Sequence, residues 1–416
     1  MARSFDVPVF YRGETISRVK DARRVMDPRK RDLAPTVLDM GTFRVKLARH
    51  FGFCYGVENA IDIAYRAVED NPGRRVFLLS EMIHNPHVND DLRARGVEFL
   101  RTTSGDELIP LDTLTPDDVV IIPAFGATIE IMERLRALGV DPMRYNTTCP
   151  FVEKVWKKSD QIGSKGYTVV VHGKRTHEET RATVSHATAS APVVVVRDMD
   201  EARDLGDVIA GRRGADFFHE RFAGLTSDGF DPARDLRRIG VVNQTTMLAT
   251  ETQAIADHLR EAAVGAHGAG AFADTSDTLC YATNENQNAA LALIESGGDM
   301  ALIVGGYNSS NTSHLVELCE AAMPTYFVSS DEELVSADVI RHFDWHAKTL
   351  RETRGWLPEG RPFDLVVTAG ASCPDALLEA VVERVAALVP GTRDLADAAA
   401  ELLAGDSLTG GIDAAA

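Results

Sequence analysis

The chain has 416 residues, too many for one ordinary hydrophobic core, so two or three domains are expected. Hydrophobic residues make up 44% and charged residues 25%, as in typical soluble globular proteins, and no apolar run approaches the roughly 18 residues of a membrane span. A net charge of −18 argues against nucleic acid as the main partner, because a phosphate backbone needs a basic surface. The start of the chain lacks a signal-peptide core, so we expect a cytoplasmic protein without a membrane anchor.

The beginning of the chain mixes polar and charged residues, including the run RVKDARRVMDPRKRD at 18–32. We interpret residues 1–44 as an N-terminal extension whose charged segment is solvated. Its acidic residues argue against a transit peptide.

From about residue 45 the sequence alternates between short apolar runs and amphipathic stretches. Eight runs rich in β-branched residues predict strands at 75–80, 118–126, 167–173, 192–196, 239–246, 300–306, 324–330 and 363–372. Helical periodicity lies between them at 56–70, 128–139 and 374–389. This alternation predicts an α/β fold with parallel sheets, in which ligands bind beyond the carboxyl ends of the strands.

The spacing of the strand ends suggests three similar α/β lobes, which we place at 45–149, 150–275 and 276–392. Residues at about 202–238 are rich in glycine and charge and predict an excursion inserted into the second lobe. The stretch 393–416 is rich in Ala, Asp and Gly and predicts a frayed C-terminal tail.

The five cysteines form an odd, sparse set, which argues against a disulfide framework. Cys54, Cys149 and Cys280 each stand in a turn that leads into a helical pattern, where the helix dipole favours the thiolate. Their spacings of 95 and 131 residues exclude a local zinc ribbon, so a shared site would have to form between lobes. Cys319 lies on the face of a predicted helix, so we expect it to pack in the core. Cys373 follows a predicted ligand loop, and we expect it to take no part in the site.

Three thiolates suit two kinds of metal centre. A tetrahedral zinc ion with an open fourth position fits, and so does a [4Fe–4S] cluster with one iron that lacks a protein ligand. The cysteine spacing does not distinguish between them. Capping residues at 274–277 strengthen the prediction of a helix start at Cys280.

Polar groups gather at the predicted strand ends. They are His84, Asn85, His177, Glu178, Glu179, Gln244, Thr245, Thr246, Ser309, Ser310, Asn311 and Ser372. Such groups bind anions at helix N-termini and in loops, although local capping could account for any one of them. Glu179 can deliver protons if burial raises its pKa. We expect Glu178 to face the opposite way on an extended segment and to be solvated or to have a supporting role.

Eight motifs, in this order, resemble the 4-hydroxy-3-methylbut-2-enyl diphosphate reductase family, which acts last in the methylerythritol phosphate route to isoprenoids. The motifs are GFCYGV, HNPHVNDDLRARGV, NTTCPFVEKV, THEET, QTT, DTLCYATNENQ, NSSNTSHL and TAGASCPD. The resemblance covers roughly residues 44–390.

The resemblance implies a three-lobed (trefoil) α/β fold around a central [4Fe–4S] cluster that is held by Cys54, Cys149 and Cys280, with one iron free of protein ligands. It implies reductive removal of the allylic hydroxyl group as water, with isopentenyl and dimethylallyl diphosphate as products. The diphosphate-binding positions match His84, His177, Ser309, Ser310, Asn311 and Ser372. The catalytic positions match Glu179, His177 and Thr245. Zinc would act only as a Lewis acid, whereas this reaction also needs electrons, which favours the cluster.

The family also implies an electron donor, ferredoxin or flavodoxin. Both are acidic, so an acidic enzyme needs a local basic patch, and the segment 18–32 is one candidate. The sequence leaves open whether the protein is a monomer or a homodimer.

One position departs from the commonest family pattern, because Phe125 in PAFGATIE replaces a phosphate-facing histidine. This form, the longer N-terminus and the insertion resemble the plant and cyanobacterial branch. We expect another donor, His87 or a backbone N–H near Gly126, to compensate.

Two other functions compete with the reductase. A cluster-dependent hydro-lyase would also leave one iron open but would need no electron donor. A zinc-stabilised protein that binds a phosphorylated metabolite would not be an enzyme at all.

Overall fold

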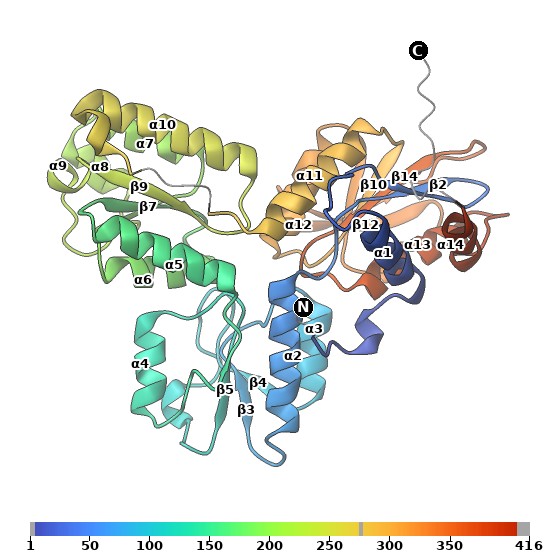
Figure 1. Ribbon diagram of the computed structural model, residues 1–416, viewed down its shortest axis with the longest axis horizontal. Helices are drawn as coiled ribbons and strands as arrows, with labels where there is room; N and C mark the ends of the chain where they lie inside the picture. Colours follow the sequence, from blue (N-terminus) through green and yellow to red (C-terminus); the bar gives the residue numbers. More distant parts are fainter. Residues whose placement is uncertain (1–4, 274–277, 406–416) are drawn as a thin grey trace. The chain divides into compact units, whose positions relative to one another are not determined.

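The computed structural model describes residues 5–273 and 278–405 (Figure 1). The predicted α/β class is confirmed, since three sheets are built mainly from parallel strands. The chain divides into two compact units, of which the first comprises 1–58, 84–86 and 281–416, and the second comprises 59–83 and 87–280.

The first unit contains a five-stranded sheet. Its strands, in spatial order, are β1 (Thr36–Asp39), β2 (Arg44–Leu47), β14 (Asp364–Ala369), β10 (Met300–Val304) and β11 (Thr325–Val328). Only the β1–β2 pair is antiparallel. The unit also contains a hairpin and the helices η1 (Val9–Tyr11), α1 (Glu14–Met26), α11 (Tyr281–Glu295), α12 (Ser310–Glu320), η4 (Asp331–Glu333), α13 (Asp375–Leu388) and α14 (Leu395–Ala404). The hairpin consists of β12 (Val339–Asp344) and β13 (Thr349–Arg354).

The two ends of the chain differ from the expected extension and tail. Helix α1 buries Ile16 and Val19 in the core of the first unit, and α14 buries Leu395 in the same core. Both helices are amphipathic, so their charged residues occupy one face while an apolar stripe is buried. The tail residues 406–416 and the predicted capping residues 274–277 lie outside the described part of the chain.

The expected lobe boundaries also differ from the structure. Strands β1 and β2 lie on either side of the expected boundary at residue 44, yet they pair with each other, and β2 pairs with β14. Strand–helix alternation along a sequence does not reveal which strands pair, because pairing depends on contacts between distant segments.

The second unit contains a four-stranded parallel sheet. Its strands, in spatial order, are β4 (Val97–Phe99), β3 (Val76–Leu78), β5 (Val119–Ile122) and β6 (Tyr145–Asn146). The helices around these strands in sequence are α2 (Tyr55–Glu69), α3 (Pro86–Ala94), η2 (Leu111–Thr113) and α4 (Ile129–Ala137). Helix α2 begins in the first unit and continues in the second.

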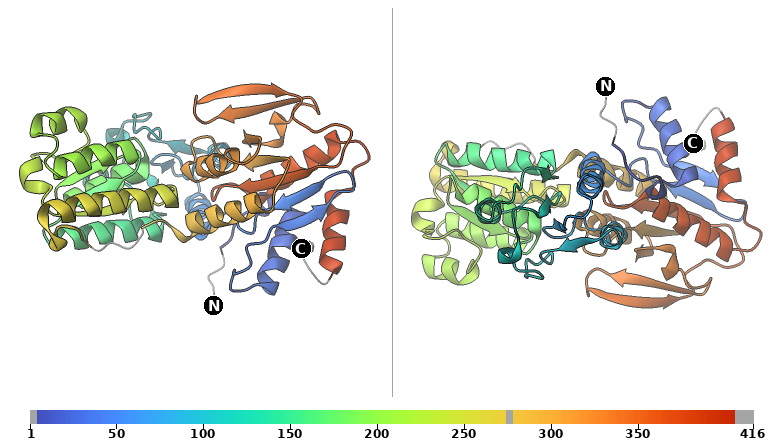
Figure 2. Two further views of the ribbon diagram at one scale, coloured as in Figure 1. Left: turned by 90° about the horizontal axis from the view of Figure 1, so that it is seen from above. Right: turned by 90° about the horizontal axis from the view of Figure 1, so that it is seen from below.

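A three-stranded parallel sheet completes the second unit. Its order is β8 (Val193–Val196), β7 (Thr168–His172) and β9 (Ile239–Asn243). Alternate valines face opposite sides: Val170 packs with α7 (Met199–Ile209) and α10 (Ala249–His267), whereas Val169 and Val171 pack with α5 (Pro150–Gly163) and α6 (Glu178–Thr188). Figures 1 and 2 show these helix pairs on the two faces.

The segment predicted as an inserted excursion is a folded part of this unit. It contains the end of α7 and the helices α8 (Ala215–Arg221) and α9 (Pro232–Asp235). Phe218, Phe222 and Phe230 are buried against α7 and α10. The short helix η3 (Ala269–Ala271) follows α10.

All eight predicted strands and all three predicted helices are confirmed at their positions. In the part of the chain that the structure describes, no helix combines the length and the apolar character that crossing a membrane requires.

Candidate functional site

The three cysteines singled out from the sequence each stand directly before a helix, as expected. Cys54 precedes α2, Cys149 is the N-cap of α5, and Cys280 precedes α11. The carbonyl oxygen of Cys54 accepts from Glu58 N at 2.9 Å, which closes the first turn of α2. All three thiols are partly exposed, whereas Cys319 and Cys373 are buried. Cys319 belongs to the apolar core of the first unit, so its predicted packing role is confirmed.

In the first unit, Cys54 lies beside the loop that carries Ser372. Cys54 N donates to Ala371 O at 3.2 Å, and the Ser372 hydroxyl group donates to His84 O at 3.2 Å. Ala371 N in turn donates to Asn311 Oδ1 at 3.0 Å. The structure therefore brings one cysteine together with three of the residues predicted to bind the diphosphate.

The other predicted diphosphate ligands of the first unit lie at the start of α12. Ser309 is the N-cap of this helix and accepts from Thr312 N at 3.3 Å, so local capping accounts for part of its role. Ser310 and Asn311 are also buried, at 4% and 3% exposure. Burying a polar side chain costs free energy unless it has a hydrogen-bonding partner. A side chain at Gly306 would collide with His84 O, since a Cβ there would lie 2.3 Å from it. Only glycine allows this close approach.

In the second unit, Glu179 and Thr245 form a buried pair. Glu179 Oε1 accepts from Thr245 N at 2.6 Å, and Oε2 accepts from Thr245 Oγ1 at 2.9 Å. Cys280 N donates to Thr245 O at 3.1 Å, so the cysteine and the acid both bond to Thr245. His177 caps α6 by accepting from Glu179 N at 3.2 Å through Nδ1. The three residues predicted to be catalytic thus lie together.

The carboxyl group of Glu179 is suited to proton transfer near neutral pH. Glu179 is 1% exposed, and burial raises its pKa to about 7, while the two hydrogen bonds from Thr245 lower it. A general acid works best when its pKa lies near the working pH.

The Cys149 thiol differs from the expectation that its helix would favour the thiolate. Burial raises its pKa to about 11. The neighbouring Cys280 and Glu179 raise it further, although hydrogen bonds from the first N–H groups of α5 lower it. Desolvation and like charge outweigh the helix dipole here. A bound metal cation would supply the positive charge that a thiolate in this setting lacks.

Glu178 differs most clearly from its expected place. Residues Glu178 and Glu179 belong to the first turn of α6 rather than to an extended segment, and Glu178 is only 6% exposed. Burial raises its pKa to about 8. The predicted extended segment is therefore wrong, and the signal in the sequence that indicates a helical turn is the helical pattern that follows THEET.

Phe125 places its ring edge against the predicted site. Its ring and that of His177 are 5.5 Å apart at 85°, an edge-on contact. Of the two substitutes suggested for the missing histidine, the N–H of Gly126 is already used, since it donates to Pro123 O at 2.9 Å. His87 is exposed near the start of α3, and its role stays a prediction.

Among the described residues, no three His, Cys, Asp or Glu side chains converge closely enough to hold a metal ion. Cys54 belongs to the first unit, and Cys149 and Cys280 belong to the second. The donor set nevertheless suits a thiolate-bound centre, because all three thiols are partly exposed and placed at helix N-termini.

The fold and these residues define an α/β protein that presents thiols, a buried acid and anion-binding donors at the ends of its strands and the starts of its helices. The sequence model described as LytB protein matches residues 45–386. The chain belongs to the LytB family.

Relatives and solved structures agree with this assignment. A Gloeobacter violaceus protein named 4-hydroxy-3-methylbut-2-enyl diphosphate reductase is 39% identical over 84% of each chain. A protein of the same name from Thermosynechococcus vestitus is 39% identical over 84% of this chain and 85% of its own.

Among solved structures, one described as (E)-4-hydroxy-3-methyl-but-2-enyl diphosphate reductase, the terminal enzyme of the non-mevalonate pathway, matches with a TM-score of 0.51. It is 25% identical and covers 82% of this chain and 97% of its own. A reductase structure from Plasmodium falciparum shares the fold, with a TM-score of 0.60 at 18% identity over 83% and 88% of the two chains.

Proposed function

We propose that this chain is a 4-hydroxy-3-methylbut-2-enyl diphosphate reductase. The allylic C–O bond of the substrate breaks, two electrons and two protons enter, and water leaves with isopentenyl or dimethylallyl diphosphate as the product. Family membership supports the proposal, and the buried Glu179–Thr245 pair carries it within the structure. This pair supplies an acid whose pKa is raised to about 7, and Thr245 also accepts a hydrogen bond from Cys280 N, which suits protonation of a leaving hydroxyl group near that cysteine.

The cofactor we propose is one [4Fe–4S] cluster with Cys54, Cys149 and Cys280 as ligands and one iron without a protein ligand. Such a cluster supplies low-potential electrons and a Lewis acid when bound. The assignment rests on the family motifs and on the position of each cysteine at the start of its own helix.

The remaining residues bind the substrate and manage its protons. In the first unit, Ser372 and Asn311 flank the loop at Ala371 and offer hydrogen-bond donors to a diphosphate, together with His84, Ser309 and Ser310. In the second unit, Thr245 orients the carboxyl group of Glu179, and His177 accepts from the backbone N–H of Glu179. Fixed donors of this kind position the substrate without reorganisation during the reaction.

Anaerobic purification followed by iron, sulfide and zinc analysis tests the cofactor, and the ratio of reductant consumed to product formed tests the reaction. We expect a brown protein with iron and sulfide that consumes two electrons for each product molecule. A colourless protein with stoichiometric zinc would support the metabolite-binding alternative. Dehydration without any consumption of reductant would instead identify a hydro-lyase.

Replacement of Phe125 by alanine should weaken substrate binding by about 2- to 10-fold. An edge-on aromatic contact contributes about 0.5–1.5 kcal/mol, and here it holds the ring of His177, a predicted substrate ligand, in place. The contact at risk is the one with His177. The control is Phe125→Leu, which keeps most of the volume but removes the aromatic edge. Unchanged KM and kcat in Phe125→Ala would eliminate a shaping role for this ring.

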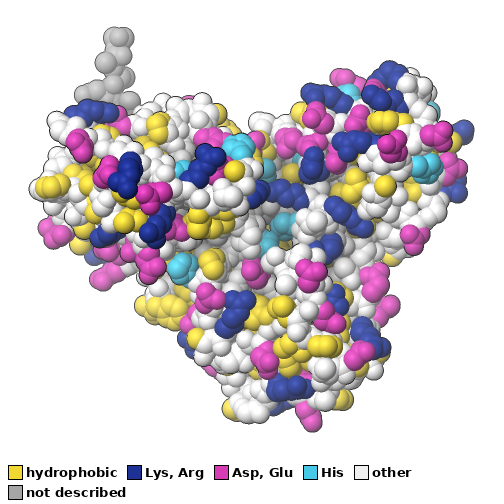
Figure 3. All heavy atoms as spheres, turned by 180° about the vertical axis from the view of Figure 1, so that it is seen from behind, with side chains coloured by type: hydrophobic (Ala, Val, Ile, Leu, Met, Phe, Trp, Pro, Cys, Tyr) yellow, Lys and Arg dark blue, Asp and Glu magenta, His cyan; other side chains and the backbone are white. Residues whose placement is uncertain are grey.

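The electron donor proposed from the family is an acidic ferredoxin or flavodoxin. The predicted basic segment is largely folded into α1, where Lys20 pairs with Asp375 at 2.7 Å. Arg18, Arg29 and Arg31 remain exposed. On the face shown in Figure 3, basic and acidic side chains are interspersed over each unit. On this face, a docking patch for an acidic donor has to be small and local.

We expect the triple substitution of Arg18, Arg29 and Arg31 by alanine to slow donor-dependent turnover by about 10-fold at low salt, because charge steers association. Turnover with an artificial dye should not change. Substitution of Arg203, Arg212 and Arg237, which are exposed in the second unit, removes the same charge and serves as the control. Equal donor-dependent rates in both triple variants would remove the segment from consideration.

A further inference from the structure

Arg181 joins two segments of the second unit that lie far apart in the sequence. It belongs to α6, and its Nη1 atom donates to Thr176 O at 2.6 Å, two residues before this helix begins. The same Nη1 donates to Ser104 O at 2.9 Å, and Nη2 donates to Thr103 O at 3.0 Å. One guanidinium group therefore binds both the start of α6 and the loop 102–106.

The loop 102–106 that accepts these bonds is held in shape by hydrogen bonds of its own. Thr102 N donates to Asp106 O at 2.9 Å, and Gly105 N donates to Thr102 O at 3.0 Å. Gly105 has a φ of +99°, which favours glycine, and a Cβ atom there would lie 3.3 Å from Arg181 Nη2. The loop thus brings its backbone close to the guanidinium group in a fixed conformation.

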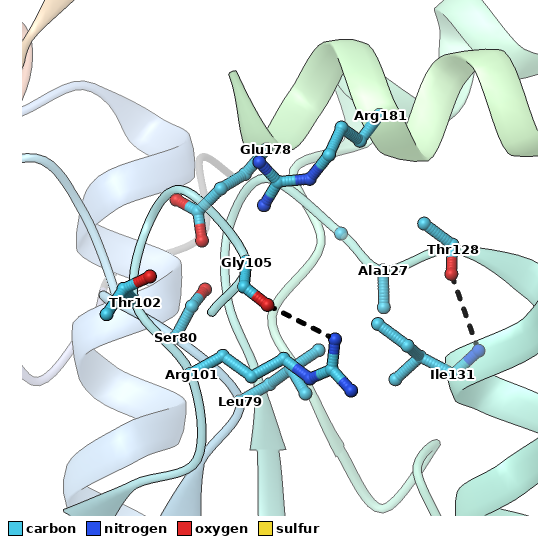
Figure 4. Close-up of a pocket in the computed structure, with 11 residues that line it drawn as sticks. Leu79, Ser80, Arg101, Thr102, Gly105, Ala127, Thr128, Ile131, Glu178 and Arg181 are labelled. Carbon is cyan, nitrogen blue, oxygen red and sulfur yellow. Dashed lines mark hydrogen bonds between the residues drawn. The ribbon is translucent and has the colours of Figure 1, made fainter. Parts of the chain in front are cut away.

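Side chains do not fill the space between this loop and the start of α6. A cavity of about 60 Å³ lies there, and its lining includes Glu178 and Arg181 from the helix and Thr102 and Gly105 from the loop (Figure 4). Figure 4 also shows the Arg181 side chain leaving α6 toward the loop. Atoms that border a void lose packing contacts on that side. Packing across this space is therefore incomplete, which leaves the distance between the loop and the helix start to the hydrogen bonds of Arg181.

The two sides of α6 have different partners. Ser185, four residues after Arg181 and hence on the same side of the helix, accepts from Ile129 N at 2.9 Å. Glu179 lies two residues before Arg181, so the two side chains point to roughly opposite sides of the helix. On its own side, Glu179 bonds to Thr245. One side of α6 is therefore anchored to the segments around 104 and 129, while the other side presents the acid.

We propose that Arg181 is a positioning residue that fixes the start of α6 and so keeps the Glu179 carboxyl group in place against Thr245. The inference rests on the proposed function, in which Glu179 is the acid. Glu179 stands three residues after Thr176 and two residues before Arg181, so it lies between the two points of the helix start that this hydrogen bond joins. Arg181 acts through Glu179 and transfers no proton itself.

The requirement for such an anchor follows from the geometry of proton transfer. An acid must lie within about 2.6–3.2 Å of the atom that receives its proton. A misplacement of about 1 Å, caused by a residue that does not take part in the chemistry, can cost about 10²-fold in rate. A loosened helix start would therefore reduce turnover even though Glu179 itself is unchanged.

The first test compares Arg181→Ala and Arg181→Lys in the full-length, cluster-loaded protein. We expect kcat in Arg181→Ala to fall about 10- to 100-fold and by a larger factor than KM changes. Arg181→Lys should give an intermediate kcat, because an ammonium group lacks the planar fork that binds both segments. The control is Arg221→Ala, which removes another half-buried arginine of the second unit, paired with Asp204 at 2.8 Å, and should leave kcat unchanged.

Double variants show whether Arg181 acts through Glu179. Arg181→Ala should cost little further kcat in the Glu179→Gln background, because that variant has no proton to be positioned. Gly105→Ala crowds the guanidinium group from the loop, so it should lower kcat too, and its effect should be less than additive with that of Arg181→Ala. Full additivity of Arg181→Ala and Glu179→Gln would show that Arg181 acts by another route and would overturn the inference.

A second measurement needs no turnover. Thr245 N donates to Glu179 Oε1 at 2.6 Å, so hydrogen exchange at this buried amide reports whether the carboxyl group is in place. In the purified protein without substrate, exchange at Thr245 should be faster in Arg181→Ala than in the wild type and unchanged in Arg221→Ala. Either a wild-type kcat or wild-type exchange at Thr245 in Arg181→Ala would defeat the inference.

Failure of this inference can be distinguished from failure of the proposed function. If Arg181→Ala kept its activity while Glu179→Gln lost it, the proposed function would stand without this anchor. If the wild-type protein did not reduce the allylic diphosphate, the proposed function would fail. Exchange at Thr245 would still decide whether Arg181 positions Glu179.

Discussion

Replacing Cys149 by serine is expected to prevent binding of the proposed iron–sulfur cluster while leaving the fold of the metal-free protein intact. Cys149 is the N-cap of α5. Serine is a favoured N-cap residue, so the helix should begin at the same place. Iron–sulfur clusters are held by thiolates, and loss of even a supporting group around a metal costs about 10- to 100-fold. Turnover should fall by more than about 100-fold, and iron and sulfide analysis of anaerobic protein measures the loss.

The matched control for this variant is Cys319→Ser, for which the opposite pattern is expected. Cys319 is 0% exposed in the apolar core, and burial raises the pKa of its thiol to about 12. A serine hydroxyl group there should lower stability by about 1–3 kcal/mol while iron content stays the same. Thermal unfolding of the metal-free proteins measures this difference. If Cys149→Ser kept its iron and sulfide, Cys149 would not be a ligand.

The second large effect is expected from Glu179→Gln, which should lose about 10²- to 10⁴-fold in kcat while substrate and cluster stay bound. Glutamine has the shape of glutamate, and its amide oxygen can still accept from Thr245 N. The Thr245 hydroxyl group can reverse its role and accept from the new amide group. What the variant lacks is a transferable proton. Single-turnover kinetics with pre-reduced protein separates this step from binding.

A suitable control for Glu179→Gln is Glu201→Gln. Glu201 is 6% exposed and accepts from Arg197 N at 2.7 Å, so it is a buried glutamate with a structural partner. Its replacement should leave turnover close to that of the wild type. A near-normal rate in Glu179→Gln would transfer the acid role to Glu178 or to the diphosphate of the substrate.

The helices and strands of this fold were largely predictable because each depends mainly on the pattern of apolar residues within its own segment. A run such as YTVVVHG is buried on both faces in a parallel sheet, so it is apolar throughout and easily recognised as β7. The hairpin β12–β13 was missed for the opposite reason. Its second strand, TLRETR, is exposed along most of its length, so it lacks the apolar alternation that predicts a strand.

The residues of the candidate site were predictable, but their burial and their pKa shifts were less so. The motifs identified Glu179 and Thr245, and the structure pairs them. The motifs could not show that Glu178 is buried, because burial there depends on Ser80 and Arg101 from strand ends far away in the sequence. The pKa of Cys149 was misjudged for the same reason, since a helix start is visible in the sequence and desolvation is not.

The sheet of the first unit also determines the order in which the protein can mature during synthesis. Arg44 of β2 pairs with Asp364 of β14, 320 positions later in the chain. The second unit is encoded almost entirely between these strands, so it can fold while the N-terminal strands still lack their partner. The Cys54 segment acquires its contact with Ala371 only when the last strand leaves the ribosome. A site that includes Cys54 can therefore be completed only at the end of translation, and a late truncation would remove the contact of a cysteine near the beginning of the chain.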